Sequence, residues 1–167
     1  MVLTKSELLA ALQNESRILT HLIGKIDRPA IDYRPSPKQR STLDLLRYLS
    51  IMGPTLIRMA NNQADVETWK AESEAANARN FDETVAVIAE QKQTYETLLS
   101  GISDETLRAD IDNFDGSKTS RGVFIIKYVL QGHAAYRTQL FLYLKSCGRD
   151  ELNTRNLWGG VDAPTPA

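Results

Sequence analysis

Apolar residues recur at helical spacing in four stretches of the chain, and polar or turn-forming segments separate these stretches. Three of the stretches open with the spacing of an N-terminal cap, a polar residue followed three positions later by an acidic one. The pattern predicts helices at about residues 5–26, 41–60, 80–100 and 120–147, the second bent by Pro54. The alternation typical of strands is absent.

The segments between the predicted helices differ in character. Residues 27–40 contain three prolines and predict an ordered connector that is not helical. Residues 61–80 are polar, lack glycine and proline, and predict a long loop with helical turns at most. The tail after Arg149 predicts a non-helical end. Four helices with such connections favour an all-α four-helix bundle, with residues 1–167 as a single domain.

Composition excludes several classes of protein. One cysteine cannot form an internal disulfide, and no apolar run approaches the roughly 20 residues that span a bilayer. The first residues mix Lys5 and Glu7 into apolar positions, unlike a signal peptide, which favours a cytoplasmic protein. A net charge of -1 provides no general attraction to nucleic acid. We therefore expect neither a membrane nor a nucleic acid as partner.

Three stretches together resemble the DinB/YfiT-like superfamily: YRPSPKQRSTLDLLRYLS, GHAAYRTQLFLYLKSCG and LNTRNLWGG. The resemblance extends over essentially the whole chain. It implies an up-down-down-up four-helix bundle, a homodimer, and a divalent metal such as zinc or nickel. In that family one histidine of the second helix and a His-x3-His pair of the fourth helix hold the metal.

The family's ligand positions fall on other residues here. Aligned by the Arg-x-Gln-Leu stretch of the fourth helix, they correspond to Tyr48, Gly132 and Tyr136. His133 is one residue away, about 100° around a helix, and replaces Gly132 only if a bulge intervenes. Glycine supplies no ligand and tyrosine binds metal well only as phenolate, so we expect a degenerate metal site and no metal cofactor. Zinc or nickel held by His133 with Tyr48 or Tyr136 is the alternative.

Five residues are candidates for ligand binding: Tyr48, Tyr136, His133, Arg137 and Glu15. The two tyrosines would either bind a small polar ligand or fill the old metal pocket. His133 would act as a general base or as a hydrogen-bonded core residue. Arg137 lies on an apolar helix face and needs an acidic partner, either Glu15 or an anionic ligand. Trp69 and Trp158, outside the predicted helices, are candidates to cover the pocket mouth or a subunit interface.

Three functions remain open on this sequence. The first is a binding protein that holds a small polar or anionic molecule in the bundle pocket. The second is a transferase, isomerase or hydrolase of the DinB type, with or without a metal. The third is a structural or interaction protein without catalysis. Catalytic residues and substrate are not assigned.

Overall fold

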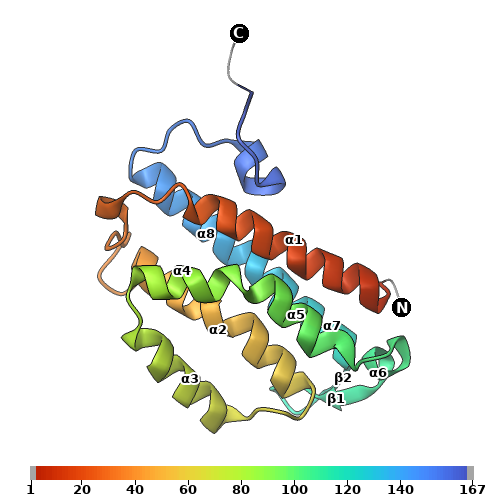
Figure 1. The fold of residues 1–167 in the computed structure, drawn as a ribbon. Helices are drawn as coiled ribbons and strands as arrows, with labels where there is room; N and C mark the ends of the chain where they lie inside the picture. Colours follow the sequence, from red (N-terminus) through yellow and green to blue (C-terminus); the bar gives the residue numbers. More distant parts are fainter. Residues whose placement is uncertain (1–2, 165–167) are drawn as a thin grey trace.

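Four helical rods lie side by side in the computed structural model, which describes residues 3–164 (Figure 1). The first rod is α1 and the second is α2; the third is divided into α4 and α5, and the fourth into α7, a π-helical segment η2, and α8. Their bounds are Lys5–Ile23 (α1), Thr42–Ala60 (α2), Phe81–Ala89 (α4), Gln91–Ser100 (α5), Arg121–Ile125 (α7), Ile126–Leu130 (η2) and Gln131–Ser146 (α8). The prediction of a mainly helical fold is confirmed.

The predicted caps begin the first three rods. Thr4 with Glu7, Ser41 with Asp44, and Asn80 with Glu83 each form both hydrogen bonds of a capping box. These caps satisfy backbone donors that the first helical turn leaves free, so the local sequence sets where each helix starts.

The core lies where the rods meet. α1 and α2 each pack against α5 and α8, and α1 and α8 point one way in Figure 1 while α2 and α5 point the other. Leucines supply much of the fully buried surface: Leu8, Leu12, Leu19, Leu22, Leu45, Leu46, Leu49, Leu140 and Leu144. This burial is the main stabilising contribution to the packing of the rods.

The segment expected to be a loop after α2 contains a helix, so that prediction was wrong. α3 (Val66–Ala78) crosses back beside α2, and Asp65 with Thr68 caps it. Only Ala76 of this helix is buried. The missing apolar stripe hid α3 from the periodicity, although its capping pair is present in the sequence.

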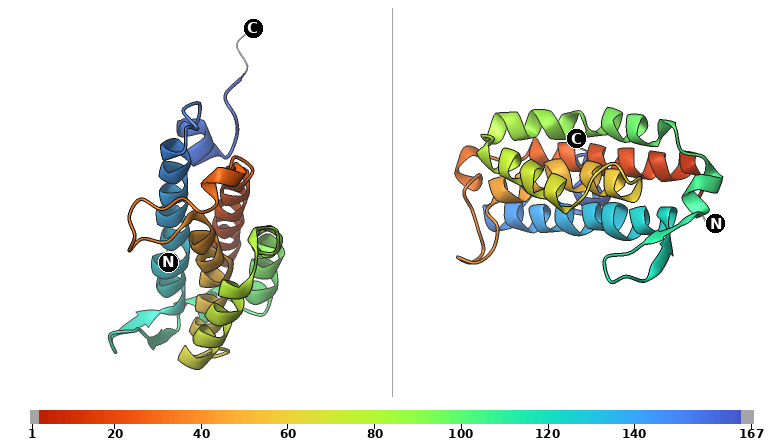
Figure 2. Two further views of the ribbon diagram at one scale, coloured as in Figure 1. Left: turned by 90° about the vertical axis from the view of Figure 1, so that its left-hand side faces the viewer. Right: turned by 90° about the horizontal axis from the view of Figure 1, so that it is seen from below.

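Two short strands correct the expectation of no β structure. After α6 (Asp104–Arg108), β1 (Asp110–Asp112) pairs antiparallel with β2 (Lys118–Ser120). Gly116, with φ of +79°, occupies the left-handed region in the connecting turn. The hairpin projects from the end of the bundle at which α1 begins (Figure 2).

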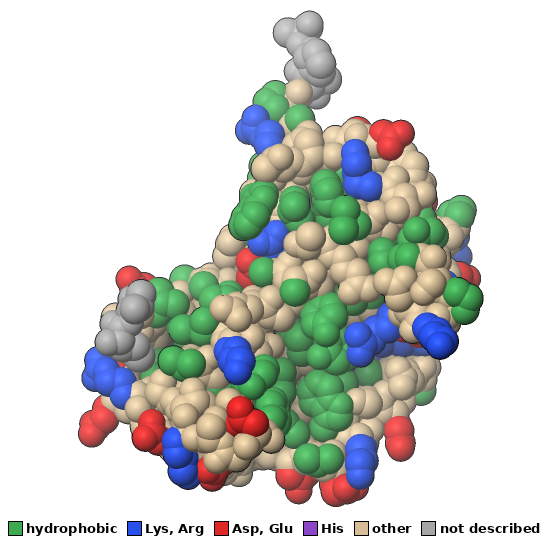
Figure 3. Space-filling view, turned by 180° about the vertical axis from the view of Figure 1, so that it is seen from behind, with side chains coloured by type: hydrophobic (Ala, Val, Ile, Leu, Met, Phe, Trp, Pro, Cys, Tyr) green, Lys and Arg blue, Asp and Glu red, His purple; other side chains and the backbone are tan. Residues whose placement is uncertain are grey.

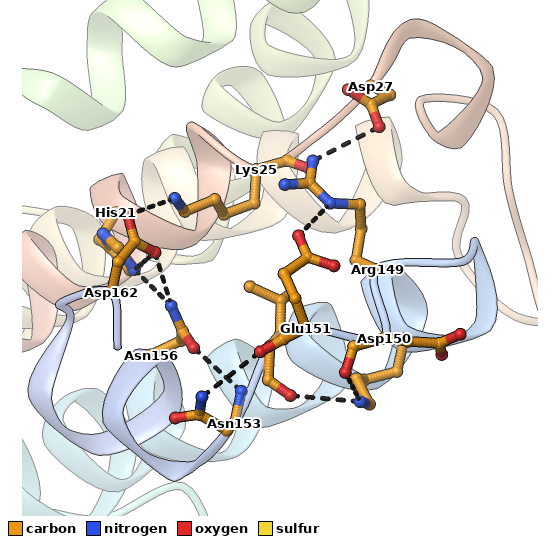
Figure 4. A network of polar contacts seen from close by, with 11 residues as sticks. His21, Lys25, Asp27, Arg149, Asp150, Glu151, Asn153, Asn156 and Asp162 are labelled. Atoms are coloured by element: carbon orange, nitrogen blue, oxygen red, sulfur yellow. Dashed lines mark hydrogen bonds and ion pairs between the residues drawn. The ribbon is translucent and has the colours of Figure 1, made fainter. Parts of the chain in front are cut away.

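The tail is not wholly irregular, contrary to expectation. A π-helical turn, η3 (Arg155–Gly159), follows α8, and a 3-10 turn, η1 (Arg28–Ala30), lies in the proline-containing connector. Asn156 is buried and donates to Asp162, which also pairs with Lys25, two residues after the end of α1 (Figure 4). These contacts attach the tail to α1. None of the helices within residues 3–164 is both long and apolar enough to span a membrane.

Candidate functional site

A pocket of about 630 Å³ opens between α2, α3, the hairpin and the fourth rod. Its wall is mainly aromatic and aliphatic, and apolar side chains gather in the lower half of the molecule in the view from behind (Figure 3). The lining residues are Tyr48, Met52, Leu56, Met59, Val66, Trp69, Phe114, Lys127, Tyr128, Gln131, Gly132, Ala135 and Tyr136. Lys127 is the one charged side chain among them.

Tyr48, Gly132 and Tyr136 all line this pocket. The rings of Tyr48 and Tyr136 meet edge to face, with their centroids 5.0 Å apart. A Cβ atom at Gly132 would lie 3.0 Å from the sulfur of Met52, so glycine lets α8 approach α2 closely. The three positions to which the resemblance assigns ligands therefore converge on one place.

The donors at these positions do not fit a zinc or nickel ion. Burial and the neighbouring Tyr136 raise the pKa of Tyr48 to about 12, so its phenol keeps its proton at neutral pH. Gly132 provides no side-chain donor. Across residues 3–164, no three His, Cys, Asp or Glu side chains gather as a metal-binding group would require.

His133 faces away from the pocket. Its side chain is 1% exposed, and its Nε2 atom lies 2.5 Å from the hydroxyl oxygen of Tyr95 in α5. Gly53 makes room for this pair, because a Cβ atom there would lie 1.9 Å from the same hydroxyl oxygen. Burial, with a smaller effect of Arg137, lowers the pKa of His133 to about 4.

The fourth rod contains a π-helical bulge, but it does not bring His133 to the position of Gly132. The π-helical segment Ile126–Leu130 precedes both Gly132 and His133. Because it shifts both residues together, it leaves them pointing in different directions from α8. Gly132 thus lines the pocket while His133 packs against α5.

Glu15 and Arg137 form a buried ion pair behind the pocket. The Nε atom of Arg137 lies 2.5 Å from Oε2 of Glu15, and their side chains are 4% and 12% exposed. Arg137 also donates to the carbonyl oxygen of Leu157, and the ring of Trp158 lies 5.2 Å from its guanidinium carbon. The expected acidic partner of Arg137 is therefore Glu15. Neither residue lines the pocket.

Several pocket residues were missed by reasoning from the sequence. One signal was present: Tyr128, Gly132 and Tyr136 are spaced by four residues and so share a helix face. This spacing would have added Tyr128, and its neighbour Lys127, to the candidate pocket residues. Phe114 reaches the pocket from the hairpin turn, which the sequence did not predict. Trp69, expected near a pocket mouth, does line it and packs against Tyr48 with centroids 6.0 Å apart.

The comparisons with known proteins bear on the fold. No family model and no curated protein match the chain. The chain is similar to the crystal structure of a DinB-like protein, YjoA, from Bacillus subtilis. The TM-score is 0.67 and the identity 14%, over 87% of this chain and 95% of that chain. At this identity the likeness shows a DinB-like fold.

Proposed function

We propose that this protein binds a small molecule in the pocket between α2, α3 and α8, without a metal ion at Tyr48, Gly132 and Tyr136. The observation that carries the proposal is the pocket itself, about 630 Å³ and largely apolar, with a single charged lining residue. This volume lies within the range of roughly 300–1,000 Å³ typical of sites for small organic ligands.

The lining selects a ligand with an apolar body and a polar or anionic group. Met52, Leu56 and Trp69 offer apolar contact, whereas the Tyr48 hydroxyl, the Gln131 amide and the Lys127 ammonium offer polar contact. Tyr48 acts as a neutral hydrogen-bond donor because its pKa is raised. The ligand is thus less polar than the sequence alone led us to expect.

We also infer that the bundle is of the up-down-down-up type. The inference is supported by the helix directions in Figure 1, where α1 and α8 are antiparallel to α2 and α5. In this arrangement α3 returns the chain between two parallel rods. That return places Trp69 beside Tyr48, so the connection supplies one wall of the pocket.

Tryptophan fluorescence tests the proposal directly. Trp69 lines the pocket, whereas Trp158 does not, so Trp158→Phe leaves one reporter at the site. We expect titration with decanoate to change Trp69 fluorescence saturably. Ala135→Phe places a ring at an exposed lining position of α8 and should abolish this change. Leu142→Phe, at an exposed position of α8 outside the pocket, is the matched control and should bind as before.

Thermal unfolding provides a second measurement. A ligand at 100 times its dissociation constant should add about 2.7 kcal/mol to the free energy of unfolding. Saturable binding that Ala135→Phe leaves unchanged would place the ligand elsewhere. No saturable response to decanoate, to decanedioate or to the diol of the same length in either measurement would overturn the proposal.

A further inference from the structure

Two cations stack on tyrosines at opposite ends of the pocket. The guanidinium carbon of Arg40 lies 4.2 Å from the ring centroid of Tyr48 and 5.9 Å from that of Tyr136. At the other end, the ammonium of Lys127 lies 5.0 Å from the ring centroid of Tyr128. All three tyrosines line the pocket, so both cations lie beside the space that a ligand would occupy.

Neither cation forms an ion pair with a carboxylate in the described part of the chain. Asp115 in the hairpin turn acts on Lys127 only at longer range: hydrogen bonds from Ser117, and to a smaller extent Lys127, lower the pKa of its carboxyl. Within residues 3–164, neither Arg40 nor Lys127 has a carboxylate within 4.0 Å. Asp44, the acidic residue nearest to Arg40 in the sequence, pairs instead with Arg34 and Arg47. No aspartate or glutamate of the described chain lines the larger pocket. The site therefore has two positive ends, neither of which is ion-paired with a carboxylate of these residues.

The backbone of Arg40 is fixed by a hydrogen bond that does not involve the Arg40 side chain. The hydroxyl of Tyr143, a residue 3% exposed, donates to the carbonyl oxygen of Arg40 at 3.1 Å. The amide of Gln139 donates in turn to the same hydroxyl. α8 thus fixes the position of the loop before α2, which reduces the entropy lost when Arg40 binds a ligand.

A second pocket extends the site toward Arg40. It has a volume of about 270 Å³ and shares Tyr48 and Trp69 with the larger pocket. Its charged lining residues are Arg40, Arg47 and Asp44, and Asp44 is already paired with Arg34 and Arg47. Tyr136, below Arg40, is about 13 Å from Lys127 along the helix axis at about 1.5 Å of rise per residue. The two positive ends are therefore separated by an apolar interval of that order.

From this arrangement we propose that the ligand is an elongated molecule with an apolar middle and a carboxylate at each end, one bound by Arg40 and the other by Lys127. The proposal rests on the proposed function, because it specifies the ligand of the same pocket. Guanidinium and ammonium groups both form charge-assisted hydrogen bonds with carboxylates, which are about twice as strong as neutral ones.

Calorimetric titration with four probes tests the proposal: decanedioate, decanoate, the neutral diol of the same length, and the shorter hexanedioate. We expect decanedioate to bind most tightly, decanoate less tightly, and both the diol and hexanedioate weakly. Arg40→Gln and Lys127→Gln should each weaken binding of decanedioate roughly tenfold and weaken binding of the neutral diol by a smaller factor. Arg40→Lys should restore part of the loss, because it keeps the charge without the planar group.

Lys38→Gln is the matched control, since Lys38 is exposed on the same loop and lines neither pocket. It should leave all four affinities unchanged. If decanedioate and the diol bind equally, and Ala135→Phe abolishes both, the proposal of two anionic ends is wrong while the proposed function stands. If neither decanoate, decanedioate nor the diol binds, the proposed function fails as well.

Discussion

The buried guanidinium of Arg137 has one carboxylate partner, that of Glu15, and the stability of the fold depends on this pair. We expect Glu15→Ala to lower the free energy of unfolding by about 3–5 kcal/mol, because it leaves the guanidinium buried without its ionic partner. Urea unfolding monitored by circular dichroism measures the loss. The double variant Glu15→Leu with Arg137→Met should lose less than the single one, since it removes both charges. A single-variant loss below about 1 kcal/mol would contradict this role.

The buried pair of His133 and Tyr95 makes stability depend on pH. The pKa of His133 is lowered from 6.5 to about 4 in the folded protein, so the unfolded chain binds more protons between these values. Stability is therefore highest above about pH 6.5 and falls as the pH approaches 4. Between about pH 7 and pH 4, this single group should lower the free energy of unfolding by about 3 kcal/mol.

Glutamine in place of His133 tests this origin. His133→Gln can still hydrogen-bond with Tyr95 but does not titrate, whereas His21 and the acidic caps remain in both proteins. Urea unfolding between pH 7 and about pH 4 should give a steeper decline for the natural protein than for the variant. Equal slopes would show that His133 does not control the acid sensitivity.

Contacts along one helix were predictable from the sequence, and contacts between helices mostly were not. Spacing placed Arg137 on an apolar face of the fourth helix, and these apolar surroundings pointed to Glu15 as its acidic partner. Tyr95 gave no such signal. It meets His133 only because Gly53 lets α2, α5 and α8 come together, a packing detail without a local pattern.

α3 is held to the bundle by a few polar contacts, since Ala76 is its one buried residue. Thr55 and Arg58 of α2 both donate to the carboxylate of Glu72. We expect Glu72→Ala to accelerate amide hydrogen exchange across Val66–Ala78 and to weaken ligand binding, because Trp69 moves with α3. The free energy of global unfolding should fall by only about 1 kcal/mol.

Glu74→Ala is the control for this prediction, since Glu74 is exposed on the same helix. It should change neither the exchange rates of α3 nor the affinity. Unchanged exchange in Glu72→Ala would mean that the aromatic contact of Trp69 with Tyr48 is sufficient to hold the helix.

The success of prediction differed among the elements for a physical reason. Strong apolar periodicity located all four rods, and capping pairs located the starts of the first three, because both signals are local. The hairpin has strands of three residues, too short to show alternation, and α3 has no apolar stripe. α3 packs on α2 and the hairpin on α7, and neither contact has a local pattern in the sequence.

At the scale of the whole molecule, the pocket is a product of assembly. Its walls come from α2, α3, the hairpin turn and the fourth rod, which lie far apart in the sequence. The two cations that we propose as the ends of the site are Arg40, before α2, and Lys127, in the π-helical segment. No motif in the sequence links them, so only the fold makes them partners.

The tail packs against α1 and α8, and Asn156 is central to that contact. Its amide nitrogen donates to Asp162 and lies 3.1 Å from Nε2 of His21, while its oxygen accepts from the backbone of Asn153. Replacing this buried amide with alanine removes all three contacts. The neighbouring carbonyl of Leu157 is also a partner of Arg137, so loosening the tail weakens the buried ion pair as well.

We therefore expect Asn156→Ala to lower the free energy of unfolding by about 1–3 kcal/mol and to accelerate amide hydrogen exchange in residues 149–162. Asn14→Ala is the control, because Asn14 is exposed on α1 and contacts the tail only through Arg17. The coupling can be measured by adding Glu15→Ala to each variant. If the tail supports Arg137, the cost of Glu15→Ala will differ between the natural and Asn156→Ala backgrounds by more than about 0.5 kcal/mol. Additive costs would mean that the tail and the ion pair are independent.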